Sequence, residues 1–73
     1  MYEVIEQNDG TFISKIVTSS GIIIDYHDKK IDAILRVISD ALFYNHITLS
    51  RENIRFSKQG FSSRTKYLLT KEI

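Results

Sequence analysis

The sequence contains no cysteine, no tryptophan and no proline, and it has only three glycines. Without cysteine the chain has no disulfide framework, no thiolate metal site and no thiol nucleophile. This excludes the disulfide-rich secreted scaffolds and the cysteine enzymes. A chain of 73 residues buries only about 60% of the surface that its unfolded state exposes. Packing alone, or contact with another chain, must therefore stabilise the fold.

Long apolar runs are also missing. The longest is Ile22-Ile23-Ile24, whereas a membrane helix needs about 20 apolar residues. The N-terminus lacks the basic region and apolar stretch of a signal peptide. We therefore expect a cytoplasmic protein that makes no membrane contact. Isoleucine outnumbers leucine by twelve to five, which is typical of AT-rich coding sequences and fits low-GC bacteria and their phages.

The rest of the composition is that of an ordinary globular domain. Hydrophobic residues make up 42% of the chain, charged residues make up 26%, and the net charge is +1. The sequence shows no internal repeat, low-complexity tract or linker. Residues 1–73 are therefore expected to form a single small domain.

Three segments in the first part of the chain have the composition of β-strands. Residues 2–6 are followed by Asp9-Gly10, a strong hairpin signal because glycine supplies the positive φ of the turn. The second strand should cover residues 11–18. Ser19-Ser20-Gly21 then indicates another turn, and residues 22–26 form a β-branched third strand. If this third segment merely continues the second, the chain has two strands here.

Residues 29–44 are predicted to form an amphipathic helix. Asp28 is the expected N-cap, and Asn45 is the expected left-handed stop. Apolar residues recur at spacings of three and four, which is the pattern of a helix with one buried face. The members of this stripe are Ile31, Ile34, Leu35, Ile38, Ala41 and Leu42.

Two further strands are predicted after the helix, over residues 53–57 and 61–70, with a turn at Lys58-Gln59-Gly60 between them. The chain as a whole therefore predicts an α+β domain. Its antiparallel sheet has the order βββαββ or ββαββ, and one helix packs on one face.

The first three strands carry apolar residues on both faces. The first face is predicted to hold Val4, Phe12, Ile16, Ile22 and Ile24, and the second to hold Ile5, Ile13, Val17 and Ile23. One helix covers only one face, so the second set predicts an interface with a partner protein or with another copy of this chain. The alternative is that a register slip, a bulge or strong coiling places part of that set in the same core.

Phe43 and Tyr44 close the predicted helix. Phe43 falls near the polar side defined by Arg36 and Asp40, and exposed aromatic rings are frequent interface anchors. The alternative is that Phe43 packs under the connector at Ile47 and Leu49.

The leading functional hypothesis is a small non-catalytic module that binds a protein partner and forms a homodimer. It would act as an inhibitor, adaptor or accessory subunit by occupying a partner surface, and its composition suits an origin in a phage or other mobile element. The candidate interface residues are Phe43, Tyr44, Ile5, Ile13 and Val17.

The alternative hypothesis is nucleic-acid binding. Residues 51–73 contain six Lys and Arg against two Asp and Glu, whereas residues 1–50 contain four against seven. A basic C-terminal hairpin suits phosphate groups, although basic residues on an outer strand also prevent edge-to-edge aggregation. The candidate residues are Arg55, Lys58, Arg64 and Lys66.

One dense cluster of titratable side chains stands at the strand-to-helix corner. Asp25, His27 and Asp28 offer carboxylate and imidazole groups that bind divalent metals, but Asp28 is already explained as a helix cap. The sequence also lacks a nucleophile elbow and a phosphate-binding glycine loop. We therefore expect no metal, no cofactor and no enzymatic activity.

Overall fold

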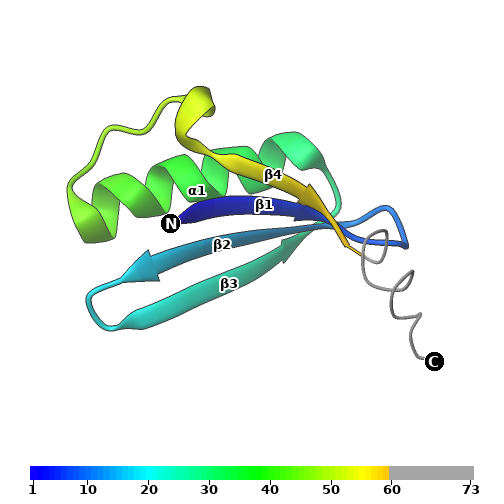
Figure 1. Cartoon of the computed structure of the whole chain (residues 1–73), viewed down its shortest axis with the longest axis horizontal. Helices are drawn as coiled ribbons and strands as arrows, with labels where there is room; N and C mark the ends of the chain where they lie inside the picture. The colour runs from blue at the N-terminus through cyan, green and yellow to red at the C-terminus, as the bar shows by residue number, and fades with distance from the viewer. Residues whose placement is uncertain (60–73) are drawn as a thin grey trace.

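The computed structural model describes residues 1–59, which form a four-stranded sheet with one helix across one face (Figure 1). The elements are β1 (Tyr2–Glu6), β2 (Phe12–Thr18), β3 (Gly21–His27), α1 (Lys30–Asn45), the 3-10 turn η1 (Arg51–Asn53) and β4 (Arg55–Lys58). The strand order across the sheet is β3-β2-β1-β4. The predicted α+β class, with one helix laid on a sheet, is confirmed.

The sheet is mixed, which corrects the prediction of a purely antiparallel one. β1, β2 and β3 pair antiparallel, but β4 runs parallel to β1, with Val4 opposite Phe56. Parallel neighbours need a crossover connection, and here α1 carries the chain from one edge of the sheet to the other. The strand predicted over residues 61–70 lies outside the described residues.

The β1–β2 connection is the hairpin that Asp9-Gly10 predicts. Gly10 has a φ of +88°, a backbone conformation that is unfavourable for a residue with a side chain. The Asp9 carboxylate accepts hydrogen bonds from the Thr11 hydroxyl at 2.6 Å and from the Thr11 amide at 3.0 Å. These bonds, the hydroxyl first, lower the pKa of Asp9 from its ordinary value of 3.8.

A second hairpin makes β3 a separate strand, so the first half of the domain is βββα. Ser19-Ser20 forms a two-residue loop, and Thr18 stands opposite Gly21, whose φ is +140°. The Thr18 hydroxyl also donates a hydrogen bond of 2.9 Å to the Gly21 carbonyl. This turn fixes the register of β3 against β2.

That register corrects the predicted faces of β3. Ile23 stands opposite the buried Ile16, so Ile23 lies on the face that α1 covers. Because side chains alternate along a strand, Ile22 and Ile24 lie on the helix-free face. The prediction had these positions reversed, since every residue in the run is isoleucine and the pattern gives no alternation.

Helix α1 begins one residue later than predicted, and Asp28 is not its cap. The N-cap position is Lys29, which makes no side-chain capping hydrogen bond. At the other end His46, with a φ of 56°, holds the left-handed position predicted for Asn45. Asn45 instead ends the helix, and its side-chain amide donates to the Tyr2 hydroxyl at 2.9 Å. Among the described residues, no helix is long and apolar enough to cross a membrane.

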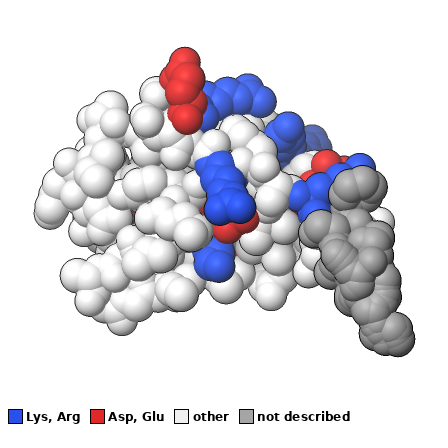
Figure 2. Space-filling model, in the orientation of Figure 1, with Lys and Arg blue, Asp and Glu red and all other residues white. Residues whose placement is uncertain are grey.

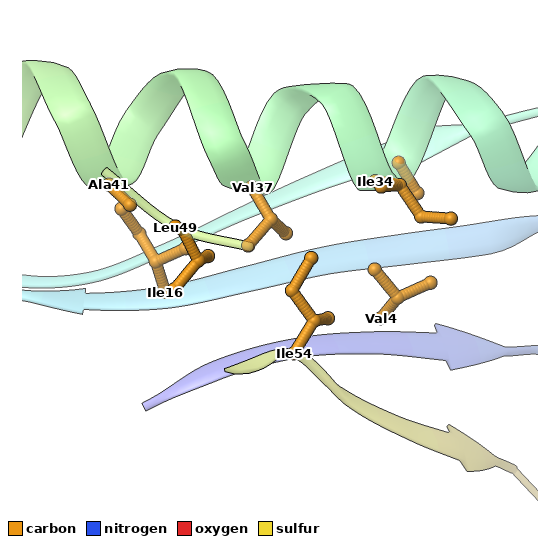
Figure 3. Packing of buried hydrophobic residues seen from close by; sticks show 8 residues of the cluster. Val4, Ile16, Ile34, Val37, Ala41, Leu49 and Ile54 are labelled. Atoms are coloured by element: carbon orange, nitrogen blue, oxygen red, sulfur yellow. The ribbon is translucent and has the colours of Figure 1, made fainter. Parts of the chain in front are cut away.

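The core lies between α1 and the sheet, closed at the side by the segment that leads into β4 (Figure 3). Val37, at the centre of the helix, is completely buried. The other buried apolar residues are Val4, Ile16, Ala33, Ile34, Ala41, Leu49 and Ile54.

The predicted helix stripe is confirmed in part, since Ile34 and Ala41 are buried and Ile38 packs against the core. Ala33 and Val37 face the sheet, whereas Ile31, Leu35 and Leu42 are exposed. Small side chains facing the sheet let the helix backbone approach it closely, so the larger side chains lie at the periphery. The prediction is wrong for Ile31, Leu35 and Leu42, and it missed Ala33 and Val37.

Candidate protein-binding surface

The helix-free face of the sheet consists of three cross-strand rows. Ile5 stands opposite Ile13, which stands opposite Tyr26 on β3. In the next row Glu3 stands opposite Lys15 on one side and Arg55 on the other. The third row pairs Val17 with Ile22. On β1 and β2, a charged row therefore separates two apolar rows. On β3, Ile24 stands opposite Lys15.

Along β3 itself this face is apolar, although Lys15 of β2 stands opposite Ile24. Tyr26 is 71% exposed, Ile22 is 58% exposed and Ile24 is 48% exposed, and Val17 on β2 is exposed beside them. Ile13 is half-buried between Ile5 and Tyr26. We call the group formed by Ile13, Val17, Ile22, Ile24 and Tyr26 the β3 patch. Contiguous exposed apolar side chains of this kind mark interaction sites on soluble proteins.

The β3 patch continues into an end of the molecule without charge. Residues 16–24 and 41–50 contain no Lys, Arg, Asp or Glu, and these segments form the β2–β3 turn and the C-terminal end of α1. In the view of Figure 2 the region at the β2–β3 turn is correspondingly white, whereas the coloured side chains lie toward the centre and the opposite end. Depletion of charge is the compositional signal of an interface core.

Phe43 and Tyr44 lie at this charge-free end. Phe43 is 71% exposed, so it does not pack under the connector at Ile47. Its ring meets that of Tyr44 edge to face, with 4.7 Å between the centroids. Tyr44 also lines a shallow hollow of about 140 Å³ with Ile22 and the β2–β3 turn.

The structure therefore divides the predicted interface residues into two groups. Val17, Phe43 and Tyr44 share the charge-free end with Ile22, whereas Ile5 and Ile13 pair with each other in the row nearer the β1–β2 turn. The prediction did not include Ile22, Ile24 and Tyr26, which are the most exposed members of the β3 patch. The spacing of the Ser19-Ser20 loop was the signal that could have placed them.

The corner between β3 and α1 holds a polar cluster on the covered face. Arg36 Nε donates a hydrogen bond of 3.2 Å to the buried Asp40 and lies 3.2 Å from a carboxylate oxygen of Asp25 as an ion pair. The hydrogen bond and charge of Asp40, and then the charge of Asp25, raise the pKa of Arg36. The His27 ring is within hydrogen-bond distance of the buried Ser14 hydroxyl, at 2.9 Å. Among residues 1–59 no three potential metal ligands come together.

The predicted nucleic-acid residues fall on different surfaces. Arg55 lies on the helix-free face beside Glu3. Lys58 lines a hollow of about 190 Å³ on the other side of β4, together with Lys30 and Phe56. Arg64 and Lys66 lie outside the described residues.

This β4 hollow combines an aromatic ring with cations. Lys30 Nζ lies 5.0 Å from the centroid of the Phe56 ring, and the guanidinium carbon of Arg51 lies 5.6 Å from it. Lys58 and Glu6 also line the hollow, so one carboxylate partly offsets the positive charge.

Comparison of the chain with protein-family models, with curated proteins and with solved structures finds no match.

Proposed function

We propose that this chain is a small non-catalytic module that binds a protein partner through the β3 patch. The observation that carries the proposal is the row of three exposed apolar side chains on the helix-free face of β3, namely Ile22, Ile24 and Tyr26. Burying such side chains against a partner is favourable by about 25 cal/mol for each Å² of apolar surface. A partner of matching chemistry has an apolar surface with a polar rim.

The mechanism that follows is steric occlusion. A flat apolar sheet face covers a partner surface, and the exposed ring of Tyr26 acts as an anchor within it. The rings of Phe43 and Tyr44, which belong to α1, extend the contact around the charge-free end. The protein is then a cytoplasmic inhibitor, adaptor or accessory subunit. The charged row of Glu3, Lys15 and Arg55 fixes the orientation of the partner, because charge pairs contribute more to register than to affinity.

Site-specific photo-crosslinking in cells tests this proposal. A benzophenone amino acid at Val17, within the β3 patch, should give one dominant adduct heavier than two copies of the chain. The matched control places the same group at Ser39, an exposed position on α1 away from the sheet, and should give no such adduct. Ile13→Asp should abolish the Val17 adduct while leaving the circular dichroism spectrum unchanged. Equal labelling from both positions, or no heavy adduct from Val17, would contradict the proposal.

A second candidate function is supported by the β4 hollow. Lys30, Arg51 and Lys58 surround Phe56 there, and aromatic rings flanked by cations stack on nucleic-acid bases. Under this alternative, a labelled single-stranded oligonucleotide should bind at low salt and dissociate as salt rises, because phosphate contacts release counterions. Lys30→Glu combined with Lys58→Glu should abolish that binding. Absence of binding by the wild-type protein at low salt would eliminate the alternative.

A further inference from the structure

The outer edge of β3 is an unpaired strand edge seven residues long. In the described part of the chain the sheet ends at β3, with β2 on its inner side and no element on its outer side. The other sheet edge, β4, is four residues long and carries Arg55 and Lys58 at its ends. The two edges therefore differ in length and in charge.

The hydrogen-bonding groups at the free edge follow from the register. The Val17 amide donates to the Met1 carbonyl at 3.2 Å, so odd-numbered residues of β2 direct their backbone groups toward β1. Even-numbered residues of β2 therefore bond to their partners on β3, which are Gly21, Ile23, Asp25 and His27. Backbone groups alternate in direction along a strand, so the N–H and C=O groups of Ile22, Ile24 and Tyr26 point outward.

Apart from Asp25, β3 carries none of the devices with which natural sheets protect an edge. Protein edges are commonly blunted by lysine, proline, bulges or inward-pointing charges. β3 contains no Lys, Arg or Pro, and its register with β2 is unbroken from Gly21 to His27. Its one charged residue, Asp25, lies on the covered face beside Arg36. Among residues 1–59, no element covers this edge, so its outward backbone groups are open to another strand.

We propose that the β3 edge pairs antiparallel with β3 of a second copy of this chain, about a two-fold axis at Ile24. In this register Ile24 stands opposite Ile24 of the second copy, and Ile22 stands opposite Tyr26. The outward N–H and C=O groups of all three residues then donate to and accept from the facing residue of the second copy. Every side-chain pair on the helix-free face is apolar, and such aliphatic and aromatic pairs stabilise a sheet.

The position of the one charged residue of β3 favours this register. Asp25 stands opposite Ile23 of the second copy, so the two β3 carboxylates do not face each other. A register shifted by two residues about Asp25 would place them directly opposite, which is unfavourable. A two-fold arrangement also closes after two subunits and leaves no β3 edge open for further growth.

Counting residues 1–59 of each copy, the dimer is a continuous sheet of eight strands in which both helices cover the same face. The two β3 patches merge on the other face and remain available to a partner, so the dimer does not depend on the proposed function. A single strand pair buries less than the roughly 800 Å² per subunit of a standard stable interface. We therefore expect a dissociation constant of about 10–100 μM.

Sedimentation velocity over a range from low micromolar to near-millimolar protein tests the pairing. The wild-type chain should move from the mass of one chain to twice that mass. Ile24→Lys and Ile24→Glu should each weaken dimerisation by about tenfold or more, because like charges meet at the axis. An equimolar mixture of the two variants should recover a dimer, because opposite charges then meet. The matched control, Val17→Lys, places a lysine on the same face away from the edge and should dimerise like the wild type.

Three results would overturn the proposal. A wild-type chain that stays monomeric at near-millimolar concentration has no self-pairing edge. If Val17→Lys dissociates the dimer as strongly as Ile24→Lys, the copies pack face to face. If the mixture of Ile24 variants stays monomeric, the two-fold axis does not lie at Ile24. If the chain dimerises in this way but the photo-crosslinker at Val17 gives no heavy adduct, the proposed function is wrong and the edge pairing still stands.

Amide hydrogen exchange provides a readout that needs no variant. The amides of Ile22 and Ile24 should exchange quickly in dilute protein and slow down as the dimer forms. Those of Ile23 and Asp25, which bond to β2 in the monomer, should be protected at both concentrations. Exchange rates of the outward amides that do not depend on concentration would refute edge pairing.

Discussion

Ile16 and Ile22 are isoleucines on neighbouring strands, and alanine at each position tests the assignment of the two sheet faces. Ile16 is 1% exposed within the core, so Ile16→Ala removes buried methyl groups and leaves a cavity. Such truncations cost about 2–5 kcal/mol, and we expect about 3 kcal/mol here. Ile22 is 58% exposed. Because full burial of an isoleucine is worth about 1.5–3 kcal/mol, we expect Ile22→Ala to cost about 1 kcal/mol.

The difference should be plain in thermal and urea unfolding. For a domain of this size 1 kcal/mol shifts the Tm by about 4–8 °C, so Ile16→Ala should lower the Tm by roughly 12–24 °C and Ile22→Ala by less than about 8 °C. Unfolding should be measured at low micromolar protein, where pairing of β3 with a second copy does not contribute to the stability. An Ile22→Ala variant as destabilised as Ile16→Ala would refute the register of β3, and with it the β3 patch.

Three further substitutions test local features. Arg36→Leu leaves the buried Asp40 carboxylate without its cation, and urea unfolding should show that the free energy of unfolding falls by about 1–2 kcal/mol. This is less than the cost of breaking a fully buried ion pair, because Arg36 is half exposed. His46→Gly relieves the left-handed backbone at the helix end and should raise stability by about 0.5–1 kcal/mol. Asp9 has a lowered pKa in the folded state, so its contribution is present above its ordinary pKa of 3.8 and is lost as pH falls through the folded value. Thr11→Val should raise that pKa toward 3.8 in an NMR titration, and an unchanged pKa would show that the hydroxyl is not the cause.

The sequence predicts the elements well because their signals are local. Asp9-Gly10 and Ser19-Ser20-Gly21 mark the two turns, and the apolar periodicity marks the helix to within one residue at each end. The faces are harder to predict wherever the pattern is uniformly apolar. In Ile22-Ile23-Ile24 each residue suits either face, and the length of the preceding loop decides which one is buried.

Helix α1 presents the same difficulty in another form. Its apolar residues cover more than half of its circumference, so more than one stripe could face the sheet. Hydrophobicity alone favours the stripe with Ile31, Leu35 and Leu42, but the structure buries Ala33 and Val37. Close packing decides the outcome, since small side chains bring the helix nearer to the sheet. Size complementarity between two elements is not visible in either element alone.

The candidate site depends on the least local contact of all. If β4 had paired with β3, then Ile22, Ile24 and Tyr26 would lie inside the sheet with their backbone groups satisfied. Instead the four residues of β4 pair parallel with β1, after the chain crosses the sheet through α1. The strand with three consecutive isoleucines is therefore left at an edge of the described sheet, with neither lysine nor proline to protect it. An edge of that composition favours aggregation unless another strand covers it, and a second β3 in antiparallel register covers it without opposing two charges.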